Sequence, residues 1–141
     1  MKSFVKISKA ITMVMCMMFG LVLFTGCPGD GADARESFVG SYKVTETVAG
    51  QLVDEYNIMI TKSSVSSTDI ILTNFFGVAG WSVNATVSGI NFTIPQQSYM
   101  GGLFGAHGSG RRDGNTLNYS TLVTISGESG QLNLVVTAIK Q

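Results

Sequence analysis

The 141-residue sequence has few of the side chains that catalysis and metal binding use. It contains two cysteines and one histidine, and its cysteines, histidine and carboxylates show no metal-ligand spacing. The histidine, His107, lies in a glycine-rich segment, and the chain has no G-x-S-x-G nucleophile turn that would present Ser109 or another serine to it. We therefore expect no enzymatic activity, no cofactor and no metal.

Basic residues are equally sparse. Arg111 and Arg112 form the only adjacent basic pair, Asp113 follows them, and no aromatic residues are interleaved with them. A nucleic-acid binder needs clustered lysines and arginines to neutralise phosphates. The sequence therefore argues against a nucleic-acid partner and predicts a solvated hairpin end at this pair.

The first 27 residues have the order of an export signal. Three lysines, Lys2, Lys6 and Lys9, precede an apolar run from 10 to 24, and the run closes on Leu-Phe-Thr-Gly-Cys at positions 23–27. This order resembles a bacterial lipoprotein signal with its lipobox. The resemblance implies that residues 1–26 are a cleaved signal peptide and that Cys27 is lipidated.

Two alternatives to lipidation are an uncleaved membrane anchor and an ordinary secretory signal. A spanning helix needs about 20 apolar residues, whereas this run is shorter and is followed by the helix-breaking Pro28-Gly29. The lipoprotein interpretation is favoured. It places the protein in the bacterial cell envelope, at the outer membrane, with the membrane as a partner through the N-terminal lipid.

The chain that remains after processing has the length of one domain. Residues 27–36 are small and polar and predict a flexible tether, and residues 37–141 form the domain. Cys16 leaves with the signal and Cys27 is acylated, so no disulfide is expected. The signal also carries three of the nine basic residues and none of the nine acidic residues, which leaves the processed chain with a net charge of −3.

From residue 37 onward, apolar and polar residues alternate with a period of two, which indicates strands that bury one face. Turn residues separate the runs at intervals too short for helices. We predict eight strands, at residues 38–48, 54–62, 69–76, 81–88, 90–94, 103–112, 116–126 and 131–140. The fold class is therefore all-β, and closing this antiparallel up-and-down meander into a barrel removes its two edges.

The first strand carries a short motif. Phe38-Val39-Gly40-Ser41-Tyr42 resembles the F-x-G-x-W/Y opening of lipocalin-like (calycin-type) barrels, with Tyr42 where lipocalins usually have Trp. Residues 38–140 also resemble small barrel lipoproteins of bacterial envelopes, and the short segments that carry this resemblance are 74–75, 93–97 and 108–110. An immunoglobulin-like sandwich is the rival fold, disfavoured by its missing Cys and Trp framework.

An eight-stranded barrel has room for either a filled core or one small ligand. The lipocalin resemblance implies a small apolar ligand, and the inward-facing residues that we expect to line its site are Trp81, Phe92, Tyr119 and Asn74. The alternative is a structural or protein-interaction lipoprotein with a filled core. Its partner would be an envelope protein that contacts the apolar, glycine-containing segment 99–104.

The sequence allows two placements for Glu46 and two conformations for the glycine-rich segment. Glu46 shares the alternation phase of Tyr42 and Val44 and is either an inward acid near the barrel mouth or a solvated strand end. The second placement is favoured, because glutamate is rarely buried without a partner. The glycines between 101 and 110 predict a strand with bulges or a mobile loop around His107.

Overall fold

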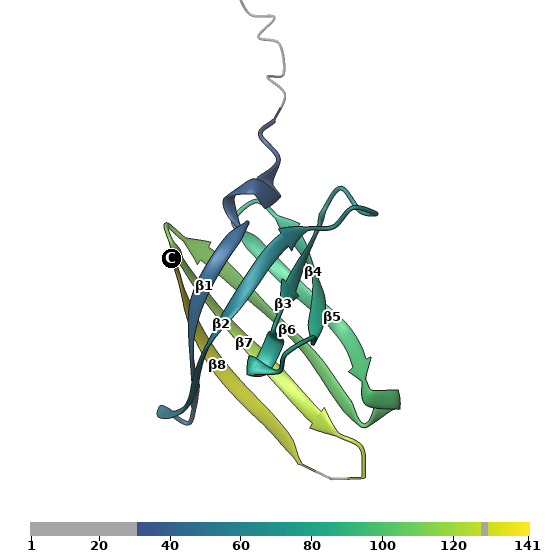
Figure 1. Ribbon diagram of the computed structural model, residues 1–141. Coiled ribbons are helices and arrows are strands. Elements are labelled where there is room, and N and C mark those ends of the chain that lie inside the picture. The colour runs from purple at the N-terminus through teal and green to yellow at the C-terminus, as the bar shows by residue number, and fades with distance from the viewer. Residues whose placement is uncertain (1–30, 128–129) are drawn as a thin grey trace, which may run out of the picture. The chain divides into compact units, whose positions relative to one another are not determined.

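The computed structural model describes residues 31–127 and 130–141 (Figure 1). The predicted signal peptide and the predicted lipidation site, Cys27, lie outside the described residues. Within the described part of the chain, no helix is long and apolar enough to cross a membrane.

Eight antiparallel strands close into a barrel in sequence order, and β8 pairs with β1 (Figure 1). This arrangement confirms the predicted all-β meander barrel. The strands are β1 (Gly40–Val48), β2 (Gln51–Lys62), β3 (Asp69–Thr73), β4 (Ser82–Ser88), β5 (Asn91–Tyr99), β6 (Phe104–Asp113), β7 (Thr116–Ile125) and β8 (Gln131–Lys140).

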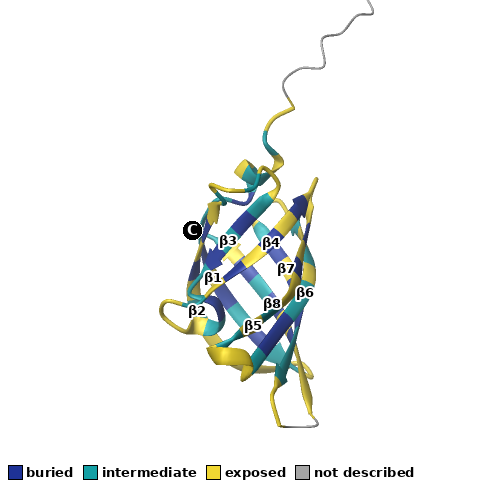
Figure 2. Ribbon diagram, turned by 90° about the vertical axis from the view of Figure 1, so that its right-hand side faces the viewer, coloured by how far each residue is buried: buried dark blue, intermediate teal, exposed yellow. Residues whose placement is uncertain are grey.

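The alternation in the sequence becomes the two faces of the barrel wall. In β4, every second residue is buried and those between are exposed, and Figure 2 shows buried bands on other strands of the barrel as well. Every strand contributes apolar side chains to one continuous core, which is the arrangement that period-two patterning favours.

Three strands differ from the predicted bounds by three residues or more, and the first is β2, which begins at Gln51 and not at residue 54. β3 ends at Thr73 because Asn74 and Phe76 adopt left-handed φ angles of 67° and 56°, and the chain turns into the short helix η3 (Phe75–Gly77). β5 instead continues to Tyr99, past Pro95, through an irregularity in its pairing with β6. Proline is tolerated at such a bulge because no ladder hydrogen bond depends on its missing N–H.

The glycine-rich segment is a strand and not a mobile loop, and the register shift beside His107 lies in its pairing with β5, between Ile94 and Gln97. β6 pairs with β7 at ten consecutive residues without a shift in register. At Gly110, a Cβ would overlap Tyr119 and lie 2.8 Å from the Phe92 ring. The glycine therefore leaves space in which two large aromatic side chains pack.

One end of the barrel is closed by the chain that leads into β1. The 3₁₀ helix η2 (Ala34–Ser37) includes three residues of the predicted tether. Arg35 donates to the carbonyl of Ser66 at 2.6 Å and pairs with Asp33 at 2.8 Å, which fastens η2 to the loop between β2 and β3. Phe38 follows and is fully buried at this end.

The motif of the first strand packs together beneath η2. The Tyr42 hydroxyl donates to the Phe38 carbonyl at 2.9 Å. The Lys140 ammonium lies 5.9 Å from the Tyr42 ring centre, and the Arg112 guanidinium lies 5.9 Å from that of Phe38. Each cation lies at a distance where it is attracted to the ring face. We call this half of the barrel the closed end.

Candidate functional site

A cavity of about 360 Å³ occupies the other end of the barrel, which we call the open end. Its walls come from the end of β1, the start of β2, the η3 turn, the β5–β6 connection and the β7–β8 hairpin, all remote from η2 (Figure 1). The lining is mostly apolar, and Glu46 is its one charged residue. The residues are Glu46, Val53, Phe76, Val78, Trp81, Tyr99, Phe104, Gly105, Ala106, Val123, Ile125, Leu132 and Leu134.

Three aromatic side chains form one wall of this cavity. The Trp81 and Tyr99 rings stack at 5.4 Å with an interplanar angle of 11°, and Phe104 lies 5.9 Å from Trp81. They come together because β4 and β5 pair only near the closed end, at Thr86–Ser88 with Asn91–Thr93. The wall between their remaining residues is therefore built by side chains rather than by a hydrogen-bonded ladder.

Gln97 links the two diverging strands. Its side-chain amide accepts from the backbone N–H of Asn84 at 3.0 Å and donates to the Asn84 carbonyl at 2.8 Å. These two bonds reproduce the pattern that a neighbouring strand would supply. They hold β4 at a fixed position beside the aromatic wall.

Glu46 faces inward and is 5% exposed, so the favoured prediction of a solvated strand end is wrong. The partner that the sequence did not reveal is Tyr56, whose hydroxyl donates to Oε1 of Glu46. A shift in the β1–β2 pairing directly after Glu46 accompanies this placement. Burial raises the pKa of Glu46, the Tyr56 hydrogen bond acts in the opposite direction, and the nearby charge of Asp54 raises it further.

Several hydroxyls are buried in the barrel interior, and the Tyr119 phenol lies close enough to Glu46 to be affected by its charge. The Tyr119 hydroxyl, the Thr121 hydroxyl and the Tyr99 hydroxyl are buried without a hydrogen-bond partner among the described residues. Burial raises the pKa of Tyr119, and the charge of Glu46 raises it further. The pKa of Tyr56 is also raised, first by burial. At neutral pH these phenols are therefore un-ionised hydrogen-bond donors.

The mouth of the cavity has an apolar rim. Six large hydrophobic side chains there are exposed, namely Val53, Val78, Met100, Leu103, Ile125 and Leu132. Four of them also line the cavity. Met100 and Leu103 belong to the turn between β5 and β6, where Met100, Gly101 and Gly102 all have positive φ angles.

The four residues predicted to line a ligand site occupy different places. Trp81 lines the cavity. Phe92 is fully buried in the packed closed half, in edge contact with both Phe38 and Tyr119. Tyr119 lies in the interior without lining the cavity, and Asn74 sits in the turn before η3, where its amide donates to the Asn57 carbonyl at 2.5 Å.

Tyr99 and Phe104 were not among the predicted lining residues. The sequence placed them in an exposed segment because two glycines separate them. Instead, the turn at Met100–Gly102 reverses the chain and sets the two side chains opposite each other, at paired positions of β5 and β6. The aromatic residue on each side of the glycines was the available signal.

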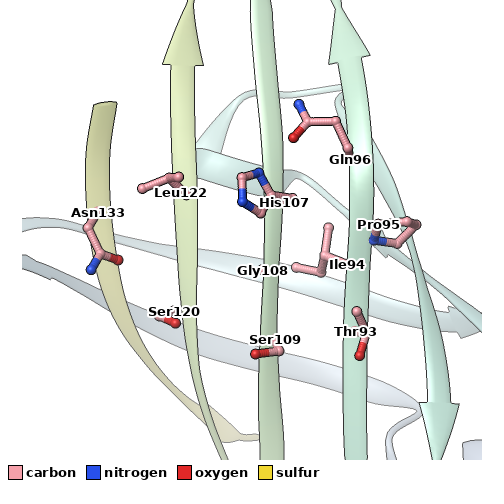
Figure 3. A pocket seen from close by; sticks show the side chains of 10 residues that line it. All are labelled: Thr93, Ile94, Pro95, Gln96, His107, Gly108, Ser109, Ser120, Leu122 and Asn133. Carbon is pink, nitrogen blue, oxygen red and sulfur yellow. The ribbon is translucent and has the colours of Figure 1, made fainter. Parts of the chain in front are cut away.

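A second hollow, of about 600 Å³, lies on the outer wall over β5 to β8 (Figure 3). His107 stands near its centre beside Leu122, and serine, threonine and amide side chains lie around it. Its lining contains no carboxylate and no cysteine. Among the described residues, no group of three or more His, Cys, Asp or Glu is placed to hold a metal ion. The hollow therefore lacks the groups of a hydrolytic triad.

The sequence matches no protein-family model and no curated protein. Solved structures do share the fold. EF1p2_mFAP2b bound to DFHBI matches with a TM-score of 0.55 and 17% identity, over 77% of this chain and 98% of that one. A redesigned β-barrel, b11L5F_LGL, matches with a TM-score of 0.52 and 16% identity, over 77% and 96%. A candidate outer membrane protein from Bacteroides fragilis has a TM-score of 0.49 and 13% identity, over 77% and 53%.

Proposed function

We propose that the protein is a lipid-anchored binding module of the bacterial cell envelope, at the outer membrane, and that it holds a small apolar ligand in the open end of its barrel. One observation carries the proposal. The barrel is packed at one end and hollow at the other, and the hollow has a mostly apolar lining with one charged group, as small-molecule sites do. The similar barrel of EF1p2_mFAP2b, bound to DFHBI, supports a binding role for this architecture.

The packing of the closed end supports the lipocalin-like interpretation. The Phe38–Tyr42 motif lies where the chain enters the barrel, with η2 across that end and two cations against its rings. The motif then has a structural role that is separate from ligand binding. It closes one end, so that a ligand enters only from the other.

The placement of η2 also gives the proposed anchor a direction. A tether from Cys27 joins the barrel at the closed end, because η2 is fastened there by Arg35. The cavity mouth lies at the opposite end of the barrel. A tether would therefore enter the barrel at η2, at the end away from the cavity mouth.

A titration tests the binding role. Trp81 is the only tryptophan and lines the cavity, so an apolar ligand such as decanol should change its fluorescence, and native mass spectrometry should detect a one-to-one complex. Val123→Phe should fill part of the cavity and weaken binding. Leu122→Phe makes a similar addition next to it, in the outer hollow, and should not. Absence of binding to the wild type, or equal loss in both variants, would overturn the proposal.

Fatty-acid labelling tests the anchor. The wild type should incorporate a radiolabelled fatty acid and partition into detergent, whereas Cys27→Ser should do neither. The variant should still fold, because no described strand depends on residue 27. Equal labelling of both proteins, or none of the wild type, would contradict the anchor and leave the cavity proposal standing.

The exposed rim favours a second candidate, in which an envelope protein docks over the mouth. Met100 and Leu103 project from the rim without lining the cavity, and exposed apolar groups of this kind mark contacts. A photocrosslinker at position 100 should then capture one protein in native membranes, and the same probe at the exposed Val65, on the β2–β3 loop, should not. Identical capture patterns at the two positions would remove this candidate.

A further inference from the structure

The cavity contains a single charged side chain, and this fact narrows the class of ligand. Glu46 is the only acid among the lining residues, and no lysine or arginine is among them. Its one described partner is the neutral Tyr56 hydroxyl, which donates to Oε1. Among residues 31–127 and 130–141, none donates a hydrogen bond to Oε2. One oxygen of a nearly buried carboxylate therefore remains available to a bound molecule.

We propose that the cavity selects ligands with an apolar body and one cationic amine, which pairs with Glu46. This inference rests on the proposed binding function and deepens it. An N–H donor on the ligand would complete the hydrogen bonding of the carboxylate, and its positive charge would balance the one charge in the lining. The apolar body would lie against Trp81 and Leu134.

The protein already bears most of the cost of such a pair. Taking a carboxylate out of water is unfavourable, but Glu46 is buried in the protein without any ligand. An arriving amine loses only its own hydration, and it gains a carboxylate that water screens little. A ligand carboxylate would instead place a second negative charge beside Glu46 and Asp54, and should be rejected.

A ligand series that differs only in its head group tests this selectivity. Decylamine, decanol and decanoate share one apolar chain and can be compared by calorimetry at pH 7. We expect decylamine to bind about ten to a hundred times more tightly than decanol, the range that a hydrogen bond to a charged group provides. Decanoate should bind most weakly.

Matched variants assign the selectivity to the cavity. Glu46→Gln should reduce decylamine binding to the level of decanol and leave decanol unchanged. Glu55→Gln removes the same charge from the outer face, where Glu55 pairs with Lys43 at 3.1 Å, and should alter neither. Tyr56→Phe frees Oε1 and should preserve or strengthen the amine preference, which tests the same acid in a second variant if Glu46→Gln folds poorly.

The outcomes separate this inference from the proposed function. If decanol binds as tightly as decylamine, or if Glu46→Gln and Glu55→Gln weaken the amine equally, the amine preference is wrong and the apolar cavity stands. If none of the three compounds binds, both the inference and the binding function fail.

Discussion

The two ends of the barrel use the same alternating sequence pattern to different effect. At the closed end, inward side chains such as Phe38, Tyr42 and Phe92 touch one another and are at most 1% exposed. At the open end, Trp81, Tyr99 and Phe104 lie around a cavity and remain partly exposed. The alternation therefore determines which side chains face inward. It does not determine whether they pack against one another or leave a cavity.

Three local features produce this difference. Gly110 lets the rings of Phe92 and Tyr119 occupy the lumen together. η2 covers the closed end, whereas the described segments around the open mouth are strand connections, two of which contain the short helices η3 and η4 (Met100–Gly102) (Figure 1). The third is that β4 and β5 pair only over Thr86–Ser88, so that side chains and not a hydrogen-bonded ladder form the wall between them at the open end. Side chains are thus fully packed at one end, whereas the other end retains a cavity.

The largest effect is expected from a matched pair of phenylalanine truncations, one at each end of the barrel. Phe38→Ala should lower the free energy of unfolding by about 3–5 kcal/mol, because it empties a fully packed site. Phe104→Ala should cost less than half as much, because one side of that ring already borders the cavity. Urea unfolding followed by circular dichroism measures both. Similar losses would mean that the open end is packed as tightly as the closed end.

A second pair adds a methyl group instead of removing a ring. Gly110→Ala should destabilise the barrel by about 1–3 kcal/mol, because the new Cβ meets Tyr119 and the Asn118 carbonyl, which cannot move independently of the strand. At Gly105→Ala the nearest atoms belong to the side chains of Thr124 and Gln96, which can rotate. Thermal unfolding should show the smaller loss for Gly105→Ala, and the reverse order would contradict the assigned role of Gly110.

The sequence predicted the barrel well because its strands depend on local information. Glycine or polar clusters mark six of the seven connections between strands, and the alternation in segments such as 82–88 directly gives the buried face. The end of β3 was predicted wrongly because it depends on a backbone conformation that the alternation does not reveal. Asn74 and Phe76 take left-handed φ angles, and a phenylalanine gives no sequence signal for such a conformation.

The site was harder to predict because its contacts join distant residues. The burial of Glu46 depends on Tyr56, ten positions away, and on a shift in strand register between Glu46 and Thr47. Phe92 was predicted to line a ligand site on its alternation phase, which was correct about direction. Its height in the barrel, which puts it in the filled half, follows from the stagger of the strands and not from its own neighbours in sequence.

The smallest expected effect concerns the acid at the boundary between the two ends. Burial raises the pKa of Glu46 in the folded protein above its ordinary value of 4.5. The ionised carboxylate is thus less favourable in the folded than in the unfolded chain. The stability that this group contributes is complete below pH 4.5 and is lost as the pH rises through its folded-state pKa.

Glu46→Gln should therefore be slightly more stable than the wild type at pH 7, by less than either packing variant changes stability, and equal to it near pH 4. The amide oxygen can still accept from Tyr56, so the substitution removes the charge and keeps the hydrogen bond. Glu55→Gln, at an exposed ion pair, should show almost no change at either pH. Urea midpoints measured across this range decide the matter. A loss of stability in Glu46→Gln at pH 7 would show that the folded barrel favours the charged form of Glu46. The site of this carboxylate would then be more polar than its burial indicates.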